Sequence, residues 1–100
     1  MTTFNDLVRN IRSQLPQEYS GHVDNTCSYV QDKLGEEHAD LDAPIPADDL
    51  QEATAEVYAL FERALHHKRY EHSHAPSGTP LASFCDALEA TLASRQPARA

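Results

Sequence analysis

Residues 50–65, LQEATAEVYALFERAL, determine the fold class. Apolar side chains recur in this stretch at steps of three and four residues, which places them on one face of a helix with 3.6 residues per turn. The acids Asp48 and Asp49 precede the stretch and the cations of HHKRYEHSH (66–74) follow it, which is the charge order that the helix dipole favours. The pattern therefore predicts one long helix over residues 47–71.

Three shorter segments flank this helix and show the same periodicity. Thr3 with Asp6 three positions later is typical of a helix start, and Pro16 is typical of a helix end. Gly35 follows the last apolar position of its segment and is predicted to end a helix in a left-handed turn. The predicted helices cover about residues 3–15, 20–35, 47–71 and 80–94.

Each predicted helix has an apolar stripe and a polar opposite face. Such a helix buries its stripe by packing against other helices, so we expect an all-α fold, a small single-domain four-helix bundle. The domain should span residues 1–94, with a flexible tail at 95–100. The core should include the stripes Val23, Cys27, Val30 and Leu34 of the second helix and Val57, Phe61, Ala64 and Leu65 of the third.

Length and cysteine content favour a small soluble cytoplasmic protein. A chain of 100 residues suits one domain with one core, and no apolar run approaches the ~20 residues that span a bilayer. We therefore expect no membrane interaction. Cys27 and Cys85 fall among apolar helical positions, where a free thiol behaves as a small hydrophobic group, so no disulfide is expected.

Charge is distributed unevenly along the chain. The net charge is −8, yet residues 17–62 alone hold twelve acids against the single base Lys33. Direct nucleic-acid binding is disfavoured, because it needs a basic face that releases counterions. An acidic surface that docks on a basic partner protein is predicted instead, while an ordinary solvated loop remains the alternative. The predicted contact residues are the eight acids between positions 36 and 56, where no lysine or arginine occurs: Glu36, Glu37, Asp40, Asp42, Asp48, Asp49, Glu52 and Glu56.

The predicted role is that of an inhibitor, an immunity-type protein or a regulatory adaptor. A nucleic-acid-binding protein or a nuclease suits such a surface as a target, because carboxylates can lie where phosphates would. In size and acidity the chain resembles bacteriocin immunity proteins and phage-encoded inhibitors, although it shares no motif with them. The same acids do not form a calcium loop: counting from Asp40, Ile45 stands where the glycine belongs and Gln51 where the glutamate belongs.

Two alternative functions stay open from the sequence. One is a metal-binding or metal-sensing bundle that holds a divalent transition metal such as zinc, although a structural zinc site usually has two separated ligand pairs. The other is a homo-oligomeric helical module that binds a small ligand between copies. No catalytic motif is present, so no enzyme activity is expected. The metal ligands would come from the histidine cluster: His66, His67, Glu71, His72 and His74.

Overall fold

The computed structural model describes residues 2–71 and 80–94. Within these two ranges the backbone forms four α-helices and two short 3₁₀ turns, and it contains no strand. The predicted all-α four-helix fold is confirmed. The helices are α1 (Phe4–Ser13), α2 (Ser20–Glu37), α3 (Leu50–Glu71) and α4 (Pro80–Ala93), and the turns are Gln17–Tyr19 and Ala47–Asp49.

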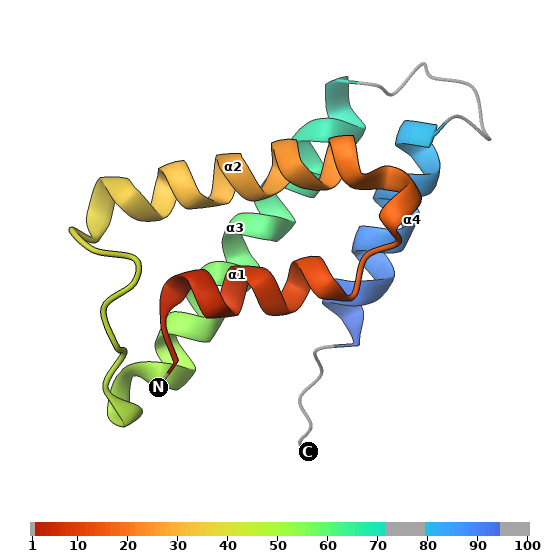
Figure 1. Cartoon of the computed structure of the whole chain (residues 1–100). Coiled ribbons are helices and arrows are strands. Elements are labelled where there is room, and N and C mark those ends of the chain that lie inside the picture. Colours follow the sequence, from red (N-terminus) through yellow and green to blue (C-terminus); the bar gives the residue numbers. More distant parts are fainter. Residues whose placement is uncertain (1, 72–79, 95–100) are drawn as a thin grey trace.

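The helices pack around α3, which contacts each of the other three. Figure 1 shows α1 and α2 side by side and running in opposite directions, with α3 crossing behind them. Helix α4 packs mainly against α3. The chain between α2 and α3 returns past the start of α1, so the N-terminal segment and this connection lie close together (Figure 1).

The predicted apolar stripes form the core. Val23, Cys27, Val30 and Leu34 are all buried, and the side chains of Val57 and Phe61 on α3 have no exposed surface. One polar side chain, Thr26, is buried with them, and its hydroxyl donates a hydrogen bond to the carbonyl of His22 at 2.9 Å. A buried hydroxyl with a partner avoids most of the cost of leaving water. One contiguous core therefore joins all four helices.

Several predicted helix boundaries are wrong by a few residues. Gly35 does not end its helix: α2 continues to Glu37, and the amide of His38 still donates to the carbonyl of Leu34 at 2.9 Å. A glycine inside a helix costs about 1 kcal/mol relative to alanine but keeps its backbone hydrogen bonds, so it does not force a stop. The predicted 3–15 is α1 with Thr3 as its cap, the predicted 47–71 begins with a 3₁₀ turn, and the predicted 80–94 ends at Ala93.

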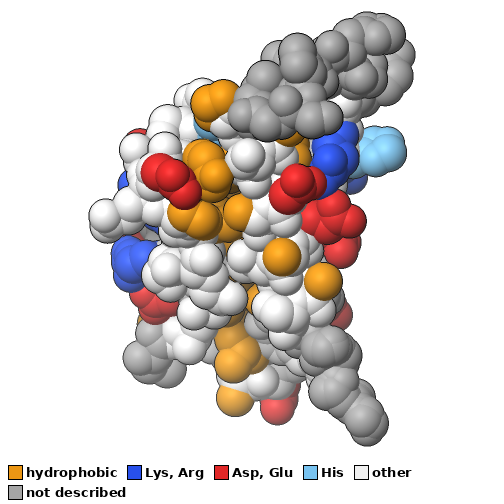
Figure 2. All heavy atoms as spheres, turned by 90° about the vertical axis from the view of Figure 1, so that its right-hand side faces the viewer, with side chains coloured by type: hydrophobic (Ala, Val, Ile, Leu, Met, Phe, Trp, Pro, Cys, Tyr) orange, Lys and Arg blue, Asp and Glu red, His pale blue; other side chains and the backbone are white. Residues whose placement is uncertain are grey.

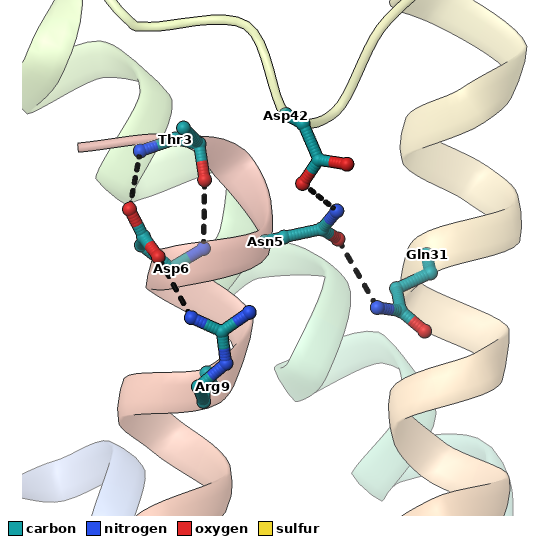
Figure 3. Close-up of polar contacts among 6 residues, drawn as sticks. All are labelled: Thr3, Asn5, Asp6, Arg9, Gln31 and Asp42. Carbon is teal, nitrogen blue, oxygen red and sulfur yellow. Dashed lines mark hydrogen bonds and ion pairs between the residues drawn. The ribbon is translucent and has the colours of Figure 1, made fainter. Parts of the chain in front are cut away.

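The start of α1 is a capping box built from Thr3 and Asp6. The Thr3 hydroxyl accepts from the Asp6 amide, and the Asp6 carboxylate accepts from the Thr3 amide, both at 3.1 Å (Figure 3). These bonds satisfy amides that have no partner inside the helix. The hydrogen bond from the Thr3 backbone holds the pKa of Asp6 below its ordinary value.

Replacing Thr3 by alanine should lower the free energy of unfolding by about 1 kcal/mol, because the Asp6 amide loses its acceptor. Urea unfolding followed by circular dichroism measures this loss. Ser13→Ala is the control, since Ser13 is exposed at the other end of α1 and its hydroxyl only donates to the Asn10 carbonyl. Equal losses in both variants would contradict a capping role for Thr3.

Both cysteines are free and buried in the core. Burial raises the pKa of the Cys27 thiol and of the Cys85 thiol above the ordinary value for cysteine. The raised pKa keeps both thiols protonated near neutral pH. Because the thiolate is the nucleophilic form, both groups are unreactive there. Their part in the fold is to fill space beside larger apolar side chains.

Candidate functional site

The connection between α2 and α3, residues 38–46, is called the linker below. It is fixed to the start of α1 by two backbone hydrogen bonds. The amide of Asn5 donates to the carbonyl of Leu41 at 3.2 Å, and the amide of Ile45 donates to the carbonyl of Thr2 at 2.8 Å. Asn5 lies in the first turn of α1, where amides lack partners inside the helix. The linker therefore completes the cap of α1, and Ile45 joins the core with 9% of its surface exposed.

Side chains add to this attachment. The side-chain amide of Asn5 donates to Asp42 at 2.7 Å, and its oxygen accepts from Gln31 of α2 at 3.1 Å (Figure 3). Asp40 closes a tight turn by accepting from the amide of Asp42 at 2.9 Å. Asn5 thus holds the linker and α2 at fixed positions relative to α1.

His38 connects three parts of the fold at the first residue of the linker. Its ring stacks on Phe4 of α1 with a centroid distance of 4.3 Å. Its Nε2 lies 3.1 and 3.2 Å from the two carboxylate oxygens of Glu56 on α3. Sequence reasoning missed both His38 and Phe4 as site residues. The available signal was that His38 is the single histidine among the acids of residues 36–56.

A groove of about 580 Å³ lies between the linker and α3, and it is called the linker groove below. The side chains of Phe4, Ile45 and Ala53 contribute its apolar lining and are themselves largely buried. The prolines of the linker add exposed apolar surface. The acidic lining residues are Glu37, Asp40, Asp49, Glu52 and Glu56, and no lysine or arginine of the described chain lines the groove.

The structure brings five of the eight predicted contact acids together in this groove. The other three lie elsewhere: Glu36 is 3.7 Å from Lys33, Asp42 is bound by Asn5, and Asp48 is exposed on the turn before α3. Glu56 is one of the five, and its side chain is only 31% exposed because it turns toward His38. The acidic surface is therefore narrower than the sequence predicted, and part of it is recessed.

The electrostatics of the linker groove favour a cation. Within the described part of the chain, Glu37, Asp49 and Glu52 have no hydrogen-bond or ion-pair partner for their side chains. Carboxylates gathered in this way repel one another, and a hollow with low-dielectric walls strengthens their common field. An incoming ammonium or guanidinium group would relieve that repulsion. The groove can thus attract a positive group and offer apolar contact to the chain that carries it.

A second hollow of about 550 Å³ lies between the end of α1 and the start of α2. It is lined by Arg9 and Arg12, but each of these cations is already paired, Arg9 with Asp6 and Arg12 with Asp24. Paired charges leave little net field for a ligand. This hollow is therefore a weaker candidate site than the linker groove.

The predicted metal site falls largely outside the described residues. His66 and His67 are exposed in the last turns of α3, whereas His72, His74 and the side chain of Glu71 lie outside the described part. Among the residues that the structure does describe, no three histidine, cysteine or acidic side chains lie close enough to hold a metal ion. Binding of zinc by the histidine cluster stays a prediction.

The cations at the end of α3 include one with a clear structural role. Arg69 donates to Asp86 at 3.0 Å and to Glu89 at 2.6 Å, which ties α3 to α4 across their exposed surface. The hydrogen bond to Asp86 raises the pKa of Arg69 further above its ordinary value. Figure 2 shows the side that carries α4, where hydrophobic side chains appear in a broken line among backbone atoms and side chains of other types. Formation of a homo-oligomer stays a prediction, because this surface does not show whether a second copy binds to it.

Comparison with protein-family models, with curated proteins and with solved structures gives no match for this chain. The candidate site is therefore defined by its own geometry. No helix in residues 2–71 and 80–94 combines the length and the apolar character needed to cross a membrane.

Proposed function

We propose that this chain is a small acidic binding protein that inhibits or regulates a basic partner protein. The observation that carries the proposal is the linker groove. It is lined by five carboxylates and by the largely buried side chains of Phe4, Ile45 and Ala53, which are called the apolar floor below. No lysine or arginine of the described chain lines it. A fold with no other use for these charges would lose stability through their repulsion. A basic surface on a partner gives them a favourable role.

The same charges favour fast association. A concentrated negative field steers a positively charged partner toward the site and can raise the association rate by about 10-fold to 1,000-fold at low salt. A nucleic-acid-binding protein or a nuclease is the natural target class, because its own groove already accepts negative phosphates. Carboxylates on this protein would take the place of those phosphates, so the chain would act by occupying the groove of its target.

The proposal is tested by reversing charge at the site and at a matched surface. Both triple variants change the net charge equally, so they separate the position of the charges from their number. The site variant is Glu37→Lys, Asp49→Lys and Glu52→Lys, and the control variant is Glu18→Lys, Asp32→Lys and Glu62→Lys, all at exposed positions.

Each protein is immobilised, exposed to an extract of the source cells, and the captured proteins are identified by mass spectrometry. We expect the wild-type and control proteins to retain the same basic partner and the site variant to lose it. With the purified partner, the site variant should associate about 10-fold more slowly at low salt and with a flatter salt dependence. A site variant that associates at the wild-type rate would refute the proposed function.

A further inference from the structure

We propose that the linker groove binds an extended segment of the partner in which two arginines are separated by one residue. This inference rests on the proposed function and specifies the chemistry of the partner. The groove suits a basic segment of another protein, because it combines an apolar floor with a negative lining that includes no lysine or arginine of the described chain.

The apolar floor favours an occupant whose charged side chain has a long aliphatic stem. Phe4, Ile45 and Ala53 line the groove together with the carboxylates, so a side chain that lies in it can contact both apolar surface and negative charge. Lysine and arginine both suit this combination, because their aliphatic stems cover apolar surface while the charged end can meet a carboxylate. A metal ion or a small inorganic cation would leave the apolar floor uncovered.

The position of Glu56 favours arginine over lysine. This carboxylate is only 31% exposed, and its partner is one nitrogen of His38, which contacts both oxygens. A carboxylate can accept about four hydrogen bonds, so it retains acceptor positions for a second donor. A planar guanidinium offers several donors in one plane and can reach two acceptors at once, whereas an ammonium acts as a point charge.

The spacing of the acids on α3 sets the spacing of the two arginines. Glu52 and Glu56 are four residues apart on the helix, and both line the groove. A helix rises 1.5 Å per residue, so these positions are separated by about 6 Å along its axis. In an extended chain, alternate residues point the same way and repeat at about 6.6 Å. Two arginines separated by one residue therefore match the two carboxylates.

Three synthetic peptides test this inference. The peptide GSRSRSG has arginines on one side of an extended chain, GSRRSSG has the same composition with arginines on opposite sides, and GSKSKSG replaces both arginines by lysine. Each is titrated into the ¹⁵N-labelled protein at low salt, and the amide shifts of Ala53 and Glu56 report binding in the groove. We expect GSRSRSG to bind about 10-fold more tightly than GSRRSSG, and GSKSKSG to bind more weakly than GSRSRSG.

Two variants assign the effect to the groove. Glu56→Gln keeps the shape of the side chain and removes its charge, so it should abolish the preference for GSRSRSG over GSRRSSG. Glu62→Gln makes the same change at an exposed position of α3 that does not line the groove, and it should leave the preference unchanged.

Equal affinities of the two arginine peptides, or shifts confined to residues outside the groove, would overturn the inference. The inference would also be overturned if none of the three peptides bound to the protein. Equal affinities alone would leave the proposed function standing, since a broad acidic surface can still dock on a basic partner. The proposed function fails separately, through unchanged partner association of the charge-reversed protein.

Discussion

Phe61→Ala should lower the free energy of unfolding by about 3–5 kcal/mol. Phe61 has no exposed surface and lies on α3, the helix that contacts the other three. Its removal deletes a large apolar side chain and leaves a cavity that neighbouring helices can only partly fill. Small domains have a total stability of about 5–15 kcal/mol, so the variant should be close to unfolding at physiological temperature.

Urea unfolding followed by circular dichroism measures the loss, and the melting temperature should fall by roughly 4–8 °C for each kcal/mol. Leu60→Ala is the matched control, because Leu60 is the adjacent residue on α3 and is only partly buried against the core. It removes fewer core contacts and should cost about 1–2 kcal/mol. If Leu60→Ala were as destabilising as Phe61→Ala, the burial of Phe61 in the core and the position of Leu60 at its edge would be contradicted.

The helices could be predicted because the residues that define each helix lie close together in the sequence. In α2, the spacing of Val23, Cys27, Val30 and Leu34 defines a face within one segment, and all four side chains are buried. Thr3 and Asp6 are three residues apart, so their mutual cap could also be anticipated. Gly35 was misjudged because a glycine permits a helix to end but does not require it.

The linker could not be predicted in the same way, because its partners are distant in sequence. The Asn5 amide finds its acceptor at Leu41, and Ile45 enters the core from between two prolines. No periodicity marks a single apolar residue in a loop. The composition of this stretch was compatible with an ordinary solvated loop, whereas tertiary contacts hold it against α1.

The candidate site combines a predictable and an unpredictable part. The run of acids is evident from charge alone, and two of them, Glu52 and Glu56, are four residues apart, a spacing that makes them neighbours on a helix. Which acids line the groove depends on how the linker folds back, and this determines that Asp42 is bound by Asn5 while Glu56 meets His38. Charge composition locates such a surface, but only the packing of the linker gives it a shape.

Ile45→Ala should release the linker from α1 before the rest of the bundle unfolds. Ile45 is the buried side chain of the linker, and the hydrogen bond that its backbone amide donates to the Thr2 carbonyl is one of the two backbone attachments. Loss of its buried methyl and methylene groups should cost about 2–4 kcal/mol. Because the linker is attached at few points, we expect this cost to appear mainly as local opening.

Hydrogen exchange followed by NMR distinguishes local opening from global unfolding. In Ile45→Ala, the backbone amides of Asn5 and of the substituted position should exchange about 30-fold faster or more, while the amide of Val30 in the centre of α2 changes less. Val23→Ala is the control, since Val23 is buried near the start of α2, far along the helix from the linker. In Val23→Ala, the exchange of the Val30 amide should accelerate at least as much as the exchange of the Asn5 amide. If the Asn5 and Val30 amides instead accelerate equally in Ile45→Ala, the linker unfolds together with the bundle, and the groove that it forms is as stable as the core itself.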